Sequence, residues 1–355
     1  MVPGSPPGGR GHEGMNPGKE GELPLVSICI PTYNRAGMVG DAIRSALSQT
    51  YPSIEVLVVD NASTDRTAEV VASFRDPRLR SVVNEENLGL FGNFNRCIAL
   101  AKGDLVHILH SDDTIPPGFA RTCVDLLLAH PEVAMTFTPA RVMGREEISA
   151  NPPGDDRIFH PPEGFRAILR DRGLIACPSV TVRREVYAEI GPFSTEYPYS
   201  SDLYEWLRIA RRQAIARVGG TYVSYRQGTH TESYRLLFES PLGYVDTARI
   251  LARVAGELGG DRDRFTPDMN IAATRFVGDC LYALCTRRRQ MKGFSPSFLA
   301  GVARSGWGLI RPQSFREKAG KAFLFLAILC SPVCCAIPGI GSLILALQGK
   351  KKISY

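Results

Sequence analysis

Short apolar segments alternate with amphipathic segments between residues 24 and 138. The apolar segments are rich in β-branched residues and predict strands at residues 25–30, 54–59, 79–83, 105–109 and 133–138. The segments between them repeat apolar residues at helical spacing and predict helices at residues 36–49, 64–74, 93–101 and 117–129. Such an alternation is typical of an α/β fold in which helices cover both faces of a mostly parallel sheet.

The alternation is less regular in the second half of the chain. Residues 139–175 are rich in Pro, Gly and charge, and they predict no particular element. Strands are expected at residues 177–183 and 218–226, and helices at residues 184–190 and 203–211. Residues 242–258, 271–284 and 298–310 then predict a helical C-terminal region.

The two ends of the chain have opposite character. Residues 1–23 are Gly, Pro and charged residues without an apolar core, so we expect disorder and no signal peptide. Residues 322–347 are uncharged and long enough to cross a bilayer, but Pro332 and Pro338 interrupt them. Lys and Arg flank both sides, which favours both ends on the cytoplasmic side. A re-entrant or interfacial hairpin is favoured, and a single span or a buried soluble hairpin stays open.

The charge is unevenly distributed over the 355 residues. The formal net charge is +6, but residues 287–355 hold twelve Lys or Arg and one acidic residue, a net of +11, which leaves 6 − 11 = −5 for residues 1–286. An acidic body with a basic tail argues against a nucleic-acid partner and suits an anionic membrane surface. The nine cysteines are mostly isolated in apolar contexts and predict reduced thiols.

Polar residues follow four of the predicted strands, where ligands bind in open α/β sheets. The four segments are PTYNR at 31–35, DNASTD at 60–65, NEENLG at 84–89 and HSDD at 110–113. Some of these residues could serve only the fold: Thr32 or Asn34 could cap the first helix, and Thr64 or Asp65 the second. Adjacent Asp112 and Asp113 could form a solvated turn. They also suit a hard divalent cation, because paired carboxylates repel each other without one.

These four motifs, in this order and spacing, resemble the family-2 glycosyltransferases of the GT-A, nucleotide-diphospho-sugar transferase-like fold. The resemblance covers residues 24–226. It implies an inverting, Mn²⁺- or Mg²⁺-dependent transfer of one sugar from a nucleotide-sugar donor to a lipid-linked or polysaccharide acceptor. The expected organisation is a disordered segment at 1–23, a GT-A domain at 24–232, a helical basic region at 233–321 and an apolar membrane-associating tail at 322–348. Within the domain, residues 24–138 form the nucleotide-sugar-binding half and residues 139–232 the acceptor half.

The resemblance also implies roles for individual residues. Asp113 is expected to be the main metal ligand, bridging to the diphosphate, and Asp112 to contact the ribose or the metal. His230 is a further candidate for the metal or the diphosphate. The residues expected to bind the nucleotide sugar are Pro31, Thr32, Tyr33, Asp60, Asn95 and Asp112.

Two positions depart from the family pattern. The family's Asp-x-Asp signature would place an acid at position 110, where this chain has His110. His110 could be a spectator, a hydrogen-bond donor or a weak ligand. The family's Ala-Arg-Asn segment aligns with Asn93, Phe94 and Asn95, so Phe94 stands at the Arg position. Whether Arg96 takes that role near the phosphates stays open.

The acceptor half carries the expected catalytic base. The Gly191-Pro192-Phe193 turn is followed by Ser201-Asp202 and a segment ending in Trp-Leu-Arg, as in the family, although Ser201 replaces the more usual Glu. By resemblance Asp202 takes the proton of the acceptor hydroxyl. Asp202 could instead only cap the following helix, and both roles can hold together.

Two other functions are weighed against this one. A nucleotidyltransferase would carry a Gly-rich, basic phosphate loop after the first strand, which PTYNR is not. A membrane-bound scaffold that binds nucleotide sugars without turnover would not need Asp113 together with Asp202. The preferred hypothesis is a glycosyltransferase at the cytoplasmic face of the membrane, peripheral or anchored by its C-terminal tail.

Overall fold

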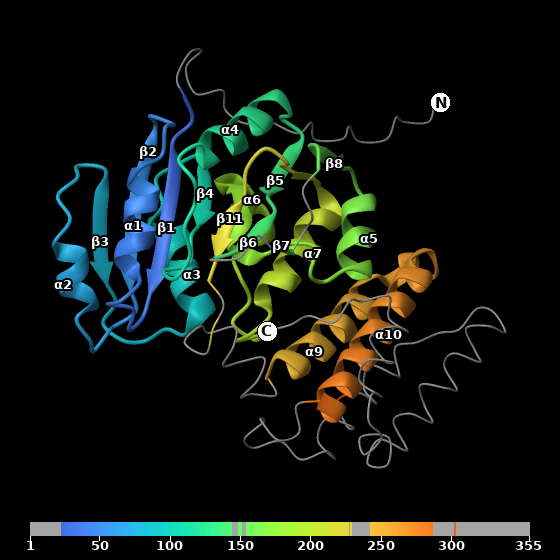
Figure 1. The fold of residues 1–355 in the computed structure, drawn as a ribbon. Helices are drawn as coiled ribbons and strands as arrows, with labels where there is room; N and C mark the ends of the chain where they lie inside the picture. Colours follow the sequence, from blue (N-terminus) through green and yellow to red (C-terminus); the bar gives the residue numbers. More distant parts are fainter. Residues whose placement is uncertain are drawn as a thin grey trace, which may run out of the picture.

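A central sheet organises the computed structural model, which describes residues 23–143, 148–150, 154–226, 228, 242–286 and 302 (Figure 1). The strands of this sheet lie in the order β3-β2-β1-β4-β9-β5-β10-β8. Their bounds are β1 Val26–Thr32, β2 Ile54–Asp60, β3 Leu79–Val83, β4 Leu105–Ile108, β5 Val133–Phe137, β8 Arg157–Phe159, β9 Val180–Arg183 and β10 Ala214–Arg217. The predicted α/β fold is confirmed, and five of the strands lie where the apolar segments predicted them.

The sheet is parallel over its first four strands and mixed beyond them. Strands β3, β2, β1 and β4 pair in parallel, whereas β9 runs antiparallel to β4 and β5. The strand predicted at 177–183 begins as the 3-10 turn η1, Cys177–Ser179, which contains Pro178. It becomes extended only at β9, which ends where α6 begins.

The strand predicted at 218–226 is wrong in its extent. Gly219, just after β10, lies against another backbone segment, because a Cβ there would lie 1.7 Å from the carbonyl oxygen of Gly154. Within this range only Val223–Tyr225 forms a strand, β11, whereas β10 precedes the range and was not predicted. Strand β11 forms a second, three-stranded sheet with β6, Ala140–Val142, and β7, Ile148–Ala150.

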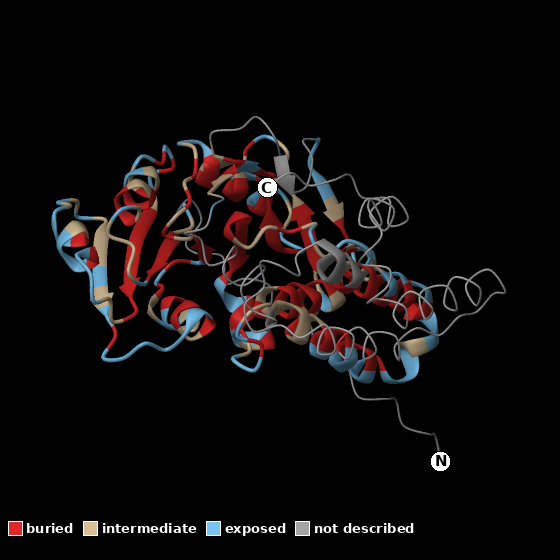
Figure 2. Cartoon of the chain, turned by 60° about the horizontal axis from the view of Figure 1, so that its bottom comes forward, coloured by how far each residue is buried: buried red, intermediate tan, exposed pale blue. Residues whose placement is uncertain are grey.

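Helices cover both faces of the sheet (Figure 2). Side chains of β1 alternate between the two cores: Ile28 and Ile30 pack with helices α1, α2 and α4, whereas Cys29 packs with α3. The helix bounds are α1 Val39–Leu47, α2 Thr67–Ala72, α3 Leu90–Leu100, α4 Phe119–Ala129, α5 Glu163–Arg170, α6 Arg184–Ile190 and α7 Ser201–Arg212. Helices α5, α6 and α7 share the core of α3.

Two C-terminal helices extend this second core. They are α9, Leu242–Glu257, and α10, Arg262–Thr286, and buried residues of both belong to the same apolar cluster as α5 and α7. The buried carboxylate of Asp268 on α10 binds Arg166 and Arg170 of α5 at 3.3 and 2.6 Å. The helical region therefore packs against helix α5, which belongs to the second half of the chain.

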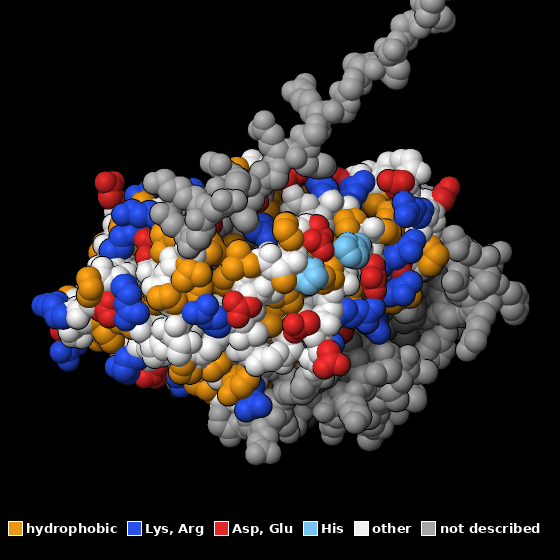
Figure 3. Space-filling model, turned by 90° about the horizontal axis from the view of Figure 1, so that it is seen from above, with side chains coloured by type: hydrophobic (Ala, Val, Ile, Leu, Met, Phe, Trp, Pro, Cys, Tyr) orange, Lys and Arg blue, Asp and Glu red, His pale blue; other side chains and the backbone are white. Residues whose placement is uncertain are grey.

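Several expectations fall outside the described residues. These are the disorder expected over residues 1–22, most of the helix at 298–310, the apolar tail at 322–348, and His230. Among the helices that the structure does describe, none combines the length and hydropathy needed to cross a membrane. The face seen in Figure 3 carries basic and acidic side chains interspersed with apolar ones.

Candidate functional site

The ends of β1 and β2 place two polar side chains next to each other. Thr32 pairs with Asp60 in the parallel ladder, and both are buried. Asp60 Oδ1 accepts hydrogen bonds from the backbone N–H and the hydroxyl of Ser63, at 3.0 and 2.5 Å. Within the described residues, Asp60 Oδ2 and the Thr32 hydroxyl have no hydrogen-bond partner. Both groups are therefore available to a polar ligand at the strand ends.

Asn34 joins the loops that follow these two strands. Its backbone adopts a left-handed φ of 52°, and its N–H donates to the hydroxyl of Ser63 at 2.8 Å. Its Oδ1 accepts from the N–H groups of Thr64 and Asp65 at 2.8 and 3.3 Å. Asn34 therefore does not cap α1, whose start has no side-chain cap. Asp65 accepts the N–H of Thr67 at 2.9 Å, at the start of α2, in line with its interpretation as a fold residue.

A buried amide network, not recognised in the sequence, fixes the same edge. The Asn84 amide donates to the side-chain oxygens of Asn61 and Asn93 at 3.0 and 2.9 Å. The Asn93 amide in turn donates to the carbonyl of Val59, next to Asp60, at 3.0 Å. The signal in the sequence was the Asn residues near apolar segments, but their mutual contacts depend on the tertiary fold.

His110, Asp112 and Asp113 form a cluster after β4. One ligand atom from each lies within 4.8 Å of the others. Asp113 is fully buried, and its Oδ2, which lies 3.6 Å from His110 Nδ1, has no hydrogen-bond donor among the described residues. Burial, followed by repulsion from Asp112, raises the pKa of Asp113 well above its ordinary value. A buried carboxylate oxygen without a donor fits a hard divalent cation, which would offset both effects.

The chemistry of His110 suits this cluster. Burial lowers the pKa of His110, which favours the neutral imidazole. A neutral imidazole offers a nitrogen lone pair, and imidazole is a ligand for several transition metals. Of the three roles left open for His110, a contact with a bound cation is therefore the one that its position in the cluster supports best.

Arg226, at the end of β11, holds the acidic pair from the other side. Its backbone N–H donates to Asp113 Oδ1 at 2.8 Å, and its Nε donates to the carbonyl of Asp112 at 2.9 Å. A longer contact of 3.5 Å joins its guanidinium to Asp41 on α1. From the sequence Arg226 ranks no higher than His230 as a candidate, because its partner at position 113 is distant in the chain.

Asp202 is the second residue of α7 rather than a residue preceding it. Its Oδ1 accepts the N–H of Leu203 at 2.8 Å. Burial raises the pKa of Asp202 from 3.8 to about 6. A carboxylate with this pKa is a more effective proton acceptor near neutral pH than an ordinary aspartate.

The pKa of the Cys177 thiol is affected by both Asp202 and the acidic cluster. Its thiol is partly buried, and burial raises its pKa well above the ordinary value. The next two causes of this raised pKa are the charges of Asp202 and Asp113. Both carboxylates therefore help to raise the pKa of one thiol, although they belong to the two different halves of the chain.

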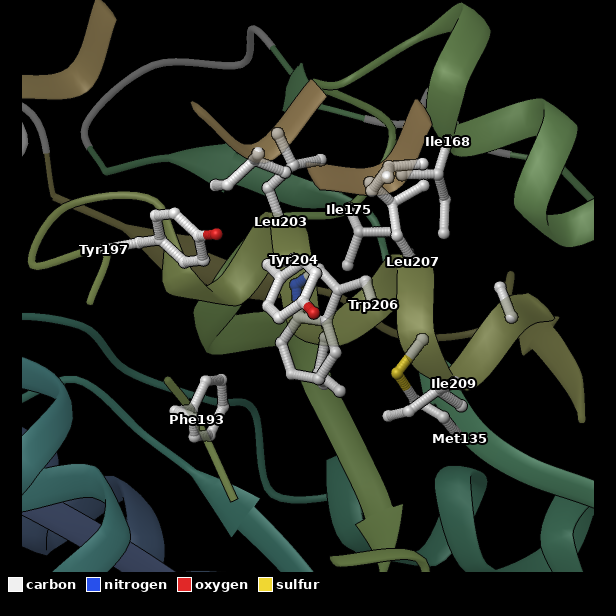
Figure 4. Packing of buried hydrophobic residues seen from close by; sticks show 14 of the residues in the cluster. Met135, Ile168, Ile175, Phe193, Tyr197, Leu203, Tyr204, Trp206, Leu207 and Ile209 are labelled. Atoms are coloured by element: carbon white, nitrogen blue, oxygen red, sulfur yellow. The ribbon is translucent and has the colours of Figure 1, made fainter. Parts of the chain in front are cut away.

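An aromatic group around Phe193 lies between these halves. The Phe193 ring contacts Phe91 and Phe94 of α3 and Trp206 of α7, with centroids 5.5 to 5.7 Å apart. Figure 4 shows Phe193 and Trp206 within the apolar cluster. Asn95 holds the backbone of Phe193 through both its amide oxygen and its amide nitrogen, at 3.0 and 2.9 Å. The expected contact of Asn95 with the donor stays a prediction.

Two other residues that were predicted to bind the nucleotide sugar, Pro31 and Tyr33, lie near Asp60. Pro31 is buried within β1, and Tyr33, which follows the strand, is 42% exposed. The structure therefore gathers Pro31, Thr32, Tyr33 and Asp60 at neighbouring strand ends. His230 lies outside the described residues.

The family comparison covers the strand ends described above. Residues 27–191 match the model of Glycosyl transferase family 2. An uncharacterized protein of Mycobacterium tuberculosis is 30% identical over 249 residues, 67% of this chain and 76% of its own length. The Escherichia coli UDP-Glc:alpha-D-GlcNAc-diphosphoundecaprenol beta-1,3-glucosyltransferase WfgD is 27% identical over 56% of this chain and 75% of its own. The putative teichuronic acid biosynthesis glycosyltransferase TuaG of Bacillus subtilis is 28% identical over 53% and 73%.

The fold has a counterpart among solved structures. The crystal structure of S. aureus TarS in complex with UDP-GlcNAc superposes with a TM-score of 0.65 at 18% identity, covering 93% of both chains. The fold and the polar strand ends thus define a GT-A type glycosyltransferase. With the match over residues 27–191, the chain belongs to glycosyltransferase family 2.

Proposed function

We propose that this glycosyltransferase moves one sugar from a nucleotide-sugar donor to an acceptor hydroxyl by an inverting, metal-dependent displacement. One observation carries the proposal: His110, Asp112 and Asp113 each bring a ligand atom within 4.8 Å of the others after β4, and the buried Oδ2 of Asp113 has no hydrogen-bond donor in the described part of the chain. A site that can hold a cation, together with a proton acceptor such as Asp202, supplies the groups that such a displacement requires.

The proposed step is a single displacement at the anomeric carbon of the donor. The acceptor oxygen forms a bond to this carbon while the bond between the carbon and the diphosphate oxygen breaks. The electron pair of the broken bond leaves with the diphosphate, and the proton of the acceptor hydroxyl passes to the Asp202 carboxylate. Attack from the side opposite the leaving group inverts the configuration of the sugar.

The donor would lie along the carboxyl ends of β1, β2 and β4. The unpartnered groups of Thr32 and Asp60 are placed to bind its nucleotide, with Pro31 and Tyr33 beside them. Asp113, Asp112 and His110 would hold Mn²⁺ or Mg²⁺, and His230 is a further candidate ligand. The cation would neutralise charge on the departing diphosphate.

The relatives suggest the classes of donor and acceptor. The name of WfgD states a UDP-glucose donor and a sugar-diphospholipid acceptor, and the TarS structure contains UDP-GlcNAc. We infer a uridine-diphosphate sugar and a lipid-linked or polysaccharide acceptor, in the synthesis of cell-envelope polysaccharide. The basic segment after residue 286 and the apolar tail support association with the anionic cytoplasmic face of a membrane.

A thermal-stability screen of the full-length protein tests the donor and metal sites. Uridine- and guanosine-diphosphate sugars are added with Mn²⁺, Mg²⁺ or EDTA, since a ligand that binds only the folded state raises the melting temperature. We expect stabilisation by a uridine-diphosphate sugar that depends on the cation. The variant Asp113→Asn should lose this dependence, and Asp125→Asn, at an exposed position on α4, should keep it.

Transfer to an acceptor then separates an enzyme from a scaffold. Radiolabelled sugar from the stabilising donor is offered to membrane lipid extracts and polysaccharide fractions. Binding without transfer or donor hydrolysis would support the scaffold. A response to metal that Asp113→Asn leaves unchanged would contradict the proposed metal site.

A further inference from the structure

Helix α9 binds the segment that leads into α7. The backbone N–H of Tyr199 donates to Oδ2 of Asp246 on α9 at 2.7 Å, and the N–H of Ser200 donates to the same carboxylate. Asp246 is almost fully buried. The next residues are Ser201 and Asp202, so the Asp246 carboxylate is bound to the backbone directly before the proposed base.

Three further contacts join α9 to this segment. The Arg249 guanidinium donates to the carbonyl of Glu196 at 2.9 Å and lies over the ring of Tyr197 at 5.3 Å. Arg253 pairs with the Glu196 carboxylate at 3.1 Å. Residues 196–200 are thus held by successive turns of one helix.

The start of α9 approaches the segment closely as well. A Cβ added at Gly243 would lie 3.1 Å from two ring atoms of Tyr199. Such a distance is shorter than ordinary van der Waals contact, so the backbone of α9 packs directly against this ring. The position of Tyr199 is therefore set by both the ring contact and the bond to Asp246.

The N-cap residue of α7 contributes no side-chain cap, although Asp202 accepts the N–H of Leu203 within the first turn. Ser200 occupies the N-cap position, but its side chain makes no capping hydrogen bond. Asp246 supplies a carboxylate from another helix at this end, where negative charge is favourable to the helix dipole. The start of α7 therefore depends on a residue that follows it by more than 40 positions.

We propose that Asp246 is a positioning residue for transfer, acting through Asp202. It fixes the backbone of Tyr199 and Ser200 and so sets where the Asp202 carboxylate lies relative to the acceptor hydroxyl. The inference rests on the proposed function, because it takes Asp202 as the proton acceptor. A shift of about 1 Å in a reacting group can cost about 100-fold in rate.

Substitution of Asp246 in the full-length protein tests this. Asn keeps one acceptor oxygen and Ala keeps none, so we expect kcat to fall about tenfold in Asp246→Asn and about 100-fold in Asp246→Ala. The Kd of the donor should stay within twofold of wild type, because the strand ends are untouched. Asp268→Asn is the matched control: Asp268 is equally buried but binds α5, so its loss should lower the melting temperature and leave kcat unchanged.

A double-mutant cycle with Asp202→Asn separates positioning from general damage. If Asp246 acts through Asp202, adding Asp246→Asn to Asp202→Asn should lower transfer by less than twofold. The same tenfold loss in both backgrounds would overturn the inference, as would wild-type kcat in Asp246→Asn. Full transfer activity in Asp202→Asn alone would instead overturn the proposed function, because Asp202 would then not be the proton acceptor. If Asp246→Ala does not fold, Arg249→Met provides the second variant, with an expected fall in kcat and unchanged donor Kd.

Discussion

The rings of Phe94 and His110 lie in contact, with centroids 5.6 Å apart. These are two of the positions at which the chain departs from the family pattern, which has Arg at the first and an acid at the second. The two departures are therefore neighbours in space. A pair that could carry opposite charges is replaced here by two uncharged rings, with Phe94 buried and His110 kept neutral by burial.

This contact predicts that the two positions are energetically coupled. Phe94→Arg alone places an unpaired charge in the core, and His110→Asp alone adds a carboxylate beside Asp112 and Asp113. Each should lower the melting temperature, while the double variant recovers about 1 kcal/mol or more of unfolding free energy through the new ion pair. Denaturant unfolding of all four proteins measures the coupling.

Phe91→Arg combined with His110→Asp is the matched control for this cycle. Phe91 is also buried in the same cluster, but its ring contacts are with Phe94 and Phe193. The unfolding free energy lost in Phe91→Arg should simply add to that lost in His110→Asp, and the double variant should recover none of it. Equal recovery in both pairs would show that the effect is one of net charge and does not depend on the contact.

Asp202→Asn is expected to lower transfer by about 10² to 10⁴, the usual range for loss of a general base. The volume hardly changes, and the amide oxygen can still accept the N–H of Leu203, so the variant should fold at least as stably as the wild type near neutral pH. Donor binding should persist, because Thr32, Asp60 and Asp113 are intact. Initial rates of transfer and donor Kd are the measurements. Asp263→Asn, an exposed acid in the first turn of α10, controls for lost charge at a helix start.

The central strands of the parallel part could be predicted because they are buried on both faces. Every residue of β1 and β2 is buried, which requires the continuous apolar segments that the sequence shows. The three-residue strands β6, β7 and β8 are too short to show a period, and β9 is preceded by a 3-10 turn. Such elements are defined by their partners in the sheet and not by a local pattern.

The candidate site divides in the same way. Asp60, Asp112, Asp113 and Asp202 could be singled out because each stands at the end of a strand or the start of a helix. The residues that hold them could not, since Arg226 meets Asp113 from 113 positions away and Asp246 meets Tyr199 from 47. A sequence shows which residues can react, whereas their supports depend on contacts between distant elements.

Asn95→Ala is expected to destabilise the protein. Both polar atoms of this side chain bind the Phe193 backbone, so their loss should cost about 1 to 3 kcal/mol. Asn95→Asp keeps the acceptor and should cost less than Asn95→Ala. Melting temperature and donor Kd are measured together. A raised Kd with unchanged stability would support the donor contact that the family resemblance implies and would contradict a purely structural role.

The raised pKa of Asp202 predicts how both transfer and stability depend on pH. The carboxylate must be ionised to accept a proton, so kcat/KM should fall about tenfold per pH unit below about 6 and level off above it.

Because the folded-state pKa lies above the ordinary 3.8, folding favours the protonated form. The contribution of Asp202 to stability is therefore greatest below about pH 4 and is lost as pH rises through 6. Unfolding of wild type and Asp202→Asn at several pH values should show their difference changing in this window, in favour of wild type at low pH. A difference that stays constant between pH 4 and 7, with a flat rate profile, would remove the buried carboxylate from the mechanism.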